Sequence, residues 1–213
     1  SLNFLNKSIS FLVFLPEMER LFQASPSYRR NFIDRLIFSA RKDYNTLINK
    51  YKKNLIERAK VLQNKDQDLD WLNVLEKQIS ENGIEIYKLR KDKINSINNQ
   101  IKIINKGDKY PFGINLQIKD NYNYEDFDTK KYIKNLSENR TIDANYGGSK
   151  IGPHKSDITA TINKNVDASQ LSTGQQKTLV LMILIAQCDY LISTENIKPI
   201  LLLDEICSHL DHF

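Results

Sequence analysis

Two neighbouring carboxylates near the C-terminal end of the chain have the spacing of a metal-dependent hydrolase site. Asp204 and Glu205 directly follow the apolar run Ile200-Leu201-Leu202-Leu203. Such a run is typical of a buried parallel strand, whose end presents the next side chains at the edge of a sheet. There one carboxylate can bind Mg²⁺ while the second activates a water molecule. The pattern therefore predicts Asp204 as the metal ligand and Asp204 with Glu205 as the catalytic pair.

The segment Leu171-Ser172-Thr173-Gly174-Gln175 has the composition of a phosphate-binding helix start. It precedes the apolar stretch Thr178 to Ala186, which favours a helix. The Ser172 hydroxyl, the free backbone N–H groups and the positive end of the helix dipole all suit a phosphate. Alternatively, Ser172 is only a helix cap and the two acids only end a strand. The two segments in this order favour the nucleotide interpretation.

The sequence lacks the motif that usually holds a triphosphate. No Gly-x-x-x-x-Gly-Lys-Ser/Thr occurs in the 213 residues. The segment Gly152-Pro153-His154-Lys155-Ser156 lacks the glycine spacing that lets backbone amides surround phosphates. The chain is therefore predicted to carry half of an ATP site, and we expect no ATP turnover from these residues alone.

Composition favours a basic protein without a membrane span. Lys and Arg outnumber Asp and Glu by 31 to 26, for a formal net charge of +5. This balance favours encounter with nucleic acid, although a basic protein without such a partner has it too. Cys188 and Cys207 lack zinc-site spacing, which indicates reduced thiols. The longest apolar stretch in the second half, Thr178 to Ala186, is far shorter than the ~20 residues of a membrane span, so we expect a cytoplasmic protein.

Hydrophobic periodicity divides the chain into three parts. The first, through about residue 25, holds a strand-like run from Ile9 to Leu15 and a helix start at Pro16. The second, residues 26–108, has apolar side chains every three or four residues on either side of a turn at Asn64 to Asp68. This pattern predicts an arm of two antiparallel helices.

The third part, residues 109–213, contains the acidic pair and the Ser172 segment. Its other expected elements are strands at 114–118 and 158–162, a short helix at 126–138, a break at Gly147-Gly148 and a hairpin-type turn at 163–165. Alternating strands and helices of this kind indicate an α/β fold.

Basic side chains lie between the apolar positions of the predicted arm. They can be a solvated helix face, which is the usual role of such residues, or they can contact DNA phosphates. The candidate DNA-binding residues are Arg29, Arg30, Arg41, Lys42, Lys52 and Lys53.

Three blocks, in order along the chain, resemble the RecF family of bacterial recombination mediators. The first is Phe14-Leu15-Pro16-Glu17 followed by Pro26 to Asp34. The second, Gly152 to Asp157, is similar to a Gly-Pro-His-Arg-Asp block of the family. The third is the Ser172 segment with the strand that ends at Asp204. The ATPase heads of this family are related to those of ABC transporters and structural-maintenance-of-chromosomes proteins.

The resemblance implies an α/β fold that is part of an ABC/SMC-type P-loop ATPase head with an inserted antiparallel helical arm. Residues 1–25 would be a strand and connection of the head, 26–108 the arm, and 109–213 the head with its signature motif, Walker B strand and D-loop. The cofactors would be ATP and Mg²⁺, and both would need a Walker A lobe ahead of these residues.

The resemblance also assigns roles at a dimer interface. The signature residues Ser172-Thr173-Gly174-Gln175 would reach the terminal phosphate of a nucleotide held by the partner subunit. Ser208 and Asp211 would belong to the D-loop, which helps to set that interface. Such a protein would be a slow DNA-dependent ATPase that dimerises on ATP around duplex DNA near single-strand junctions. Its partners would be DNA, a second copy of itself and RecR-type mediator proteins, with no membrane, and it would assist recombinase loading.

Two other functions stay open. The chain can be a head fragment without catalysis that acts as a passive nucleic-acid or partner-binding module, or it can be a soluble ATPase head of another pathway. Glu205 departs from the second Asp of many RecF relatives, because its side chain is one methylene longer.

Three structural expectations follow. Lys177 is interpreted as a solvated first-turn lysine rather than an interface cation, and His154 as a polar side chain that fixes a turn. The strand that ends at Asp204 is expected to lack parallel neighbours and to expose apolar edges, which favours self-association.

Overall fold

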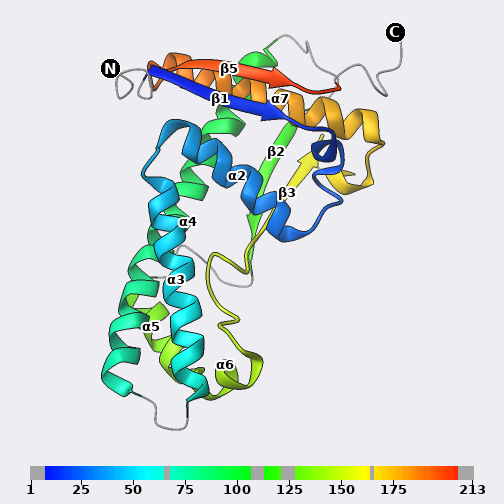
Figure 1. Ribbon diagram of the computed structural model, residues 1–213. Helices are drawn as coiled ribbons and strands as arrows, with labels where there is room; N and C mark the ends of the chain where they lie inside the picture. The colour runs from blue at the N-terminus through cyan, green and yellow to red at the C-terminus, as the bar shows by residue number, and fades with distance from the viewer. Residues whose placement is uncertain (1–7, 65–67, 107–112, 121–127, 164–165, 206–213) are drawn as a thin grey trace. The chain divides into compact units, whose positions relative to one another are not determined.

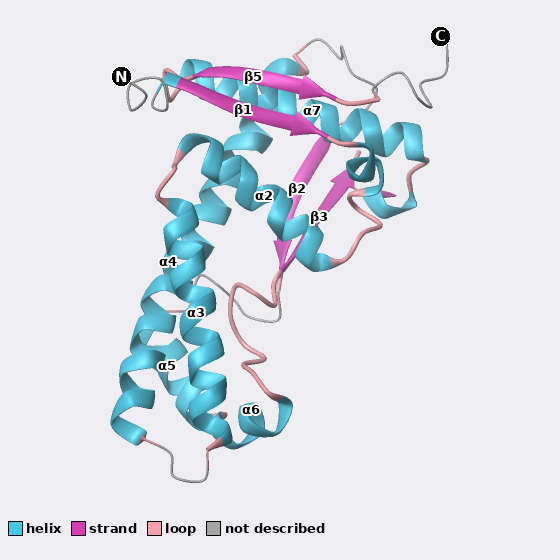
Figure 2. Cartoon of the chain, in the orientation of Figure 1, coloured by secondary structure: helices cyan, strands magenta, loops and turns pink. Residues whose placement is uncertain are grey.

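The computed structural model of the protein describes residues 8–64, 68–106, 113–120, 128–163 and 166–205. They form two compact units, the first from residues within 1–42, 91–119 and 157–213, and the second from residues within 43–90 and 120–156. Figure 2 distinguishes helices from strands. In chain order (Figure 1) the elements are β1 (Ile9–Phe14), η1 (Pro16–Arg20), α2 (Pro26–Ala40), α3 (Tyr44–Gln63), α4 (Leu69–Ile104), β2 (Ile114–Lys119), α5 (Thr129–Glu138), α6 (Arg140–Tyr146), β3 (Asp157–Ile162), β4 (Val166–Asp167), η3 (Ala168–Gln170), α7 (Thr173–Ser193) and β5 (Lys198–Leu203).

The first unit contains a two-stranded parallel sheet of β1 and β5. The two strands lie side by side (Figure 1). Ile9 lies opposite Lys198, and Phe14 lies opposite Leu203. The predicted parallel strand before Asp204 is therefore confirmed. The expectation that it would lack a parallel neighbour is wrong, because β1 supplies one.

The two faces of this sheet differ in exposure. Leu12 and Phe14 of β1 are buried, whereas Phe11 is 62% exposed. Ile200 and Leu202 of β5 are 41% and 50% exposed. Successive side chains of a strand point to opposite faces, so one face of the sheet is covered and the other is open. The prediction that β5 is buried is therefore wrong, and the apolar surface that it exposes is a sheet face.

Helix α7 packs against β1, β5 and η1 (Figure 1). It is apolar on almost every side, as expected of a helix enclosed in a core. By length and composition α7 could cross a membrane, although the sequence had led us to expect no such segment. Because 56% of its most apolar window is buried inside the protein, α7 is the core helix of the first unit.

A three-stranded antiparallel sheet, in the order β2-β3-β4, also belongs to the first unit. The strands predicted at 114–118 and 158–162 are confirmed as β2 and β3, with Leu116 opposite Ala160. The Asn98 side chain of α4 accepts from the N–H of Leu116 and donates to its carbonyl, at 2.9 Å each. These two bonds attach the end of α4 to the open edge of the sheet, where backbone groups would otherwise lack partners.

Helix α2 is part of the first unit and packs against β1 and β3. It ends at Ala40, where Arg41 takes extended backbone, and α3 begins at Tyr44. The helical arm predicted from Pro26 onward is thus interrupted. The apolar pattern does not reveal this break, because Ala40 and Leu47 keep a seven-residue repeat across it.

The second unit is built from α3, the first part of α4, α5 and α6. Helices α3 and α4 run antiparallel, as predicted (Figure 1). At the centre of the unit, the buried Arg58 guanidinium of α3 lies 3.0 Å from Glu76 of α4 and 2.7 Å from Asp143 of α6. It also donates to the Leu136 carbonyl of α5 at 2.7 Å. One buried cation therefore joins all four helices, with its charge paired and each of its three nitrogens donating a hydrogen bond.

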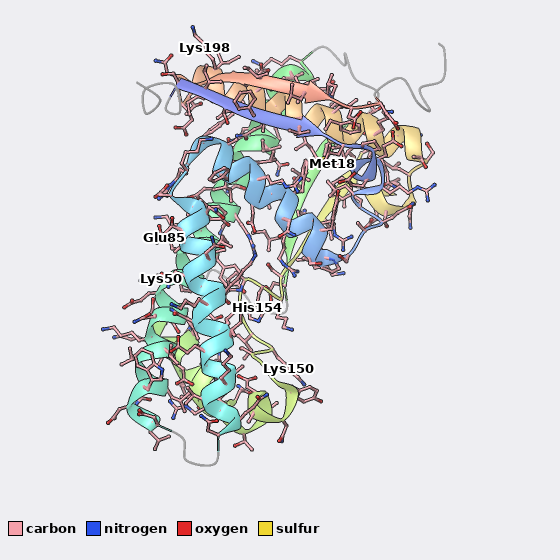
Figure 3. All side chains as sticks on the ribbon, viewed as in Figure 1. Met18, Lys50, Glu85, Lys150, His154 and Lys198 are labelled. Carbon is pink, nitrogen blue, oxygen red and sulfur yellow. The ribbon has the colours of Figure 1, made fainter. Side chains whose placement is uncertain are left out.

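The Gly-Pro-His segment forms a turn beside two buried tyrosines of the second unit. His154 (labelled in Figure 3) places Nδ1 2.8 Å from the Tyr51 hydroxyl and Nε2 2.8 Å from the Ser149 carbonyl. The Tyr51 hydroxyl lies 3.0 Å from that of Tyr132. Gly152 has a φ of +129°, and a Cβ there would overlap the Tyr132 hydroxyl. The interpretation of His154 as a residue that fixes a turn agrees with this geometry.

Candidate nucleotide site and nucleic-acid interface

Asp204 and Glu205 follow β5 directly, and both are exposed. The Asp204 N–H donates to the Phe14 carbonyl at 3.2 Å, which extends the β1–β5 ladder to the predicted metal ligand. Glu205 has a φ of +50°, in the left-handed region, so the strand ends there and the chain turns. The structure thus brings the two carboxylates to the carboxyl end of a parallel strand pair, as the sequence predicted.

Ser172 caps the N-terminus of α7 in a reciprocal arrangement. Its Oγ accepts from the Gln175 N–H at 3.3 Å, and the Gln175 side chain accepts from the Ser172 N–H at 3.1 Å. Because the serine oxygen accepts, its O–H can still donate to an anion. Thr173 and Gly174 occupy the first helical turn, where N–H groups have no partner within the helix. The four signature residues therefore meet at one helix start, with Ser172 and Gln175 exposed.

Lys177 differs from its expected role. Its side chain is fully buried rather than solvated. Its Nζ lies 2.7 Å from a carboxylate oxygen of Glu19 in η1 and donates to the Glu205 carbonyl at 3.1 Å. The interpretation of Lys177 as a solvated lysine is therefore wrong. The signal in the sequence was its position in a helix that is apolar on all sides, since a lysine there has no polar face to occupy.

The described residues fit a magnesium ion that arrives with a nucleotide. Within the described ranges, no group of three or more His, Cys, Asp or Glu side chains could hold a metal ion. Mg²⁺ is commonly bound by one or two carboxylates together with phosphate oxygens and water, and the exposed Asp204 suits that mode. The predicted D-loop residues Ser208 and Asp211 lie outside the described residues.

Four of the six predicted DNA-binding residues lie in the first unit. Arg29 donates to both carboxylate oxygens of Asp157 at 2.8 Å and to two backbone carbonyls. The Arg29 side chain is only 12% exposed, so this prediction is corrected: Arg29 attaches α2 to β3. Arg30 is half-buried, whereas Arg41 and Lys42 are exposed.

Lys52 and Lys53 lie on the exposed side of α3 in the second unit. With Asn49, Ile56, Glu57 and Lys60 they line a shallow, open groove. Lys50, labelled in Figure 3, is exposed on the same helix. Lys60 was not selected from the sequence, although it follows Lys52 by eight residues, or about 12 Å along the same side of the helix. These lysines form a basic surface on one helix, named here the α3 lysine surface (Lys52, Lys53 and Lys60).

The chain is similar in sequence to bacterial DNA-repair proteins. No family model matches the chain. The chain is 33% identical over 217 residues to the DNA replication and repair protein RecF of Rickettsia typhi, and 33% identical over 212 residues to RecF of Rickettsia prowazekii. Each match covers 98% of this chain but 59% of the relative. The chain thus spans less than two thirds of the length of these relatives.

Solved structures give the same result for the fold. The structure of the recombination mediator RecF with ATP, from the RecFOR pathway, superposes with a TM-score of 0.80 at 25% identity. The match covers 95% of this chain and 56% of that one. A second RecF structure, with an ATP analogue, gives a TM-score of 0.78. The expected RecF-type ATPase fold is therefore confirmed.

Proposed function

We propose that this chain, a RecF homologue along almost its whole length, acts in recombinational DNA repair as part of an ATP-dependent, cytoplasmic DNA-binding protein. The observation that carries the proposal is that the chain has two features of a nucleotide site, both at exposed positions. One is the capped helix start at Ser172, and the other is the acidic pair Asp204-Glu205 at the end of a parallel strand. Similarity to RecF proteins over 98% of the chain supports it.

In this proposal the two features serve different nucleotides of a dimer. Ser172 and the first-turn N–H groups of α7 bind the terminal phosphate of ATP held by the partner, because a helix N-terminus favours negative charge. Asp204 holds Mg²⁺ and Glu205 orients and deprotonates water. Bound Mg²⁺ supplies charge neutralisation at the phosphates. The longer side chain of Glu205 places its carboxylate one methylene further from the strand than an Asp would.

DNA binding is proposed for the α3 lysine surface. Three exposed ammonium groups on one helix suit a row of phosphates and carry no sequence preference. The solved RecF relatives are recombination mediators of the RecFOR pathway. We therefore propose duplex DNA near single-strand junctions as the ligand, RecR-type proteins as partners and recombinase loading as the outcome.

Fluorescence anisotropy on labelled duplex DNA at several salt concentrations tests this interface. The double variant Lys52→Glu, Lys53→Glu should bind more weakly and with a shallower salt dependence, because each phosphate contact releases close to one counterion. The control is Lys130→Glu, Lys131→Glu, which makes the same charge change at exposed positions of α5. If both pairs weaken binding equally, only net charge matters and the α3 lysine surface is not a site.

A passive binding module is the second candidate, because the 213 residues contain no phosphate-binding glycine loop. ATP distinguishes the two. In a version extended to the length of the relatives, ATP should tighten DNA binding if closure of a dimer brings two basic surfaces to one duplex. A passive module should bind DNA equally with and without ATP.

A further inference from the structure

We infer that Lys177 is a positioning residue that connects the signature helix to the acidic pair and sets the orientation of Glu205. The inference rests on the proposed function for its consequence in catalysis. Its structural part, the attachment of the Glu205 peptide by Lys177, stands on the geometry of the first unit alone.

Lys177 joins three segments that are distant in sequence. It belongs to the second turn of α7, its Nζ forms an ion pair with Glu19 of η1 at 2.7 Å, and it donates to the Glu205 carbonyl at 3.1 Å. The Lys177 side chain is 0% exposed. An ammonium group that is removed from water needs such partners, because a buried charge without them is strongly disfavoured. The ion pair therefore fixes the position of Nζ, and Nζ in turn fixes the Glu205 carbonyl.

Lys177 bonds to Glu205, the residue that orients the water molecule in the proposed function. Glu205 has a φ of +50°, a conformation that few residues other than glycine adopt without help. Its carbonyl and its side chain share one Cα, so a bond to the carbonyl restrains the direction in which the side chain leaves the backbone. Asp204, one residue earlier, is held separately through its N–H by the Phe14 carbonyl of β1. The two carboxylates are thus positioned by different groups.

The same lysine lies close to the signature. Ser172 and Lys177 are five residues apart, or about 7.5 Å along the helix axis. The α7 backbone between them is helical from Thr173 onward, so a displacement of the helix start moves Lys177 with it. Contact of Ser172 with one nucleotide would therefore reach, through Lys177, the Glu205 that acts on the other nucleotide.

Hydrogen–deuterium exchange on the 213-residue chain tests the structural part. Lys177→Met should speed exchange in the peptide that covers 198–205 by about tenfold, because the end of β5 loses its attachment. Exchange in β2 and β3 should stay unchanged, which shows that the unit is still folded. Glu19→Gln leaves the buried Lys177 ammonium without its counter-ion, so it should also speed exchange in the same peptide. Thr178→Val is the control, because Thr178 Oγ1 bonds only the Gly174 carbonyl of its own helix.

Kinetics on a version extended to the length of the relatives test the catalytic part. Lys177→Met should lower kcat by about tenfold or more with little change in ATP affinity, and Lys177→Arg should restore part of the loss. A lysine that only stabilises the fold would instead leave kcat per folded molecule unchanged. Unchanged exchange at 198–205 in Lys177→Met would overturn the inference and leave the proposed function intact. An extended wild-type protein that neither binds nor hydrolyses ATP would overturn the proposed function. The exchange rate of residues 198–205 in Lys177→Met would still test whether Lys177 holds the Glu205 carbonyl.

Discussion

Arg58 and Asp143 form an ion pair of 2.7 Å in which both side chains are almost completely buried, at 1% and 2% exposure. The other carboxylate beside Arg58, that of Glu76, also pairs with Arg140. Removing the Asp143 carboxylate therefore leaves two arginines to share one carboxylate, with an excess positive charge inside the protein. Asp143→Asn should therefore lower the free energy of unfolding by about 3–5 kcal/mol. Urea denaturation measures the loss, with Lys134→Gln as control, because the Lys134–Glu138 pair is exposed and such pairs contribute little. A loss below 1 kcal/mol for Asp143→Asn would show that the pair does not hold the second unit together.

The lowered pKa of Lys93 leads us to expect that the protein becomes more stable in alkaline solution. Burial lowers the pKa of Lys93 from 10.5 to about 8. Its Nζ lies 3.1 Å from the Gln187 amide oxygen and 3.7 Å from the centre of the Tyr190 ring. The folded pKa is the lower one, so between pH 8 and 10 the unfolded chain binds more protons. The free energy of unfolding should therefore rise with pH, by about 2 kcal/mol over this window.

Denaturation of wild type and Lys93→Met across pH 8 to 10 measures this contribution. The tyrosines and Cys188 titrate in both proteins, so their difference isolates Lys93. The variant should lack the rise. Parallel curves for the two proteins would mean that Lys93 stays charged in the folded state.

Gly152 should resist any substitution that adds a side chain. Its φ of +129° is disfavoured for other residues, and a Cβ would overlap the Tyr132 hydroxyl and lie 2.5 Å from that of Tyr51. Gly152→Ala should therefore destabilise the protein by about 3 kcal/mol or more. Gly148→Ala is the control, because nothing lies within 4 Å of a Cβ there. Similar melting temperatures for the two variants would contradict the described turn.

The open face of the β1–β5 sheet should make this chain self-associate. Phe11, Val13, Ile200 and Leu202 alternate on exposed positions of two adjacent strands. Contiguous apolar patches of this kind favour association. Val13→Lys with Leu202→Lys should reduce the mass measured by light scattering at high protein concentration, whereas Ile142→Lys on α6 should not. A concentration-independent monomer for the wild-type chain would contradict this expectation.

Features that depend on local sequence could be predicted. The Ser172 cap follows from a serine followed three residues later by glutamine, and both bonds of the capping box are present. The parallel strand before Asp204 follows from four consecutive branched apolar residues. Both features are encoded by neighbouring residues, so a short window contains the whole signal.

Features that depend on distant partners could not be predicted. The partners of two basic residues are examples, because Lys177 pairs with Glu19 and Arg29 pairs with Asp157, each in another segment of the chain. The residues next to a lysine or arginine do not indicate which distant carboxylate it meets. The break between α2 and α3 was missed for a related reason, because the apolar repeat continues across it while the packing partners change.

The claim that the signature and the acidic pair serve different nucleotides has one direct test. In the version extended to the length of the relatives, Ser172→Arg and Glu205→Gln should each abolish ATP turnover. Mixed in equal amounts, half of the dimers pair one variant with the other, and each has one intact site built from Glu205 of one subunit and Ser172 of its partner. ATP turnover should then recover to about a quarter of the wild-type rate, as two-fold symmetry requires. Turnover that stays at zero in the mixture, while the two variants still form mixed dimers, would contradict a site shared between subunits.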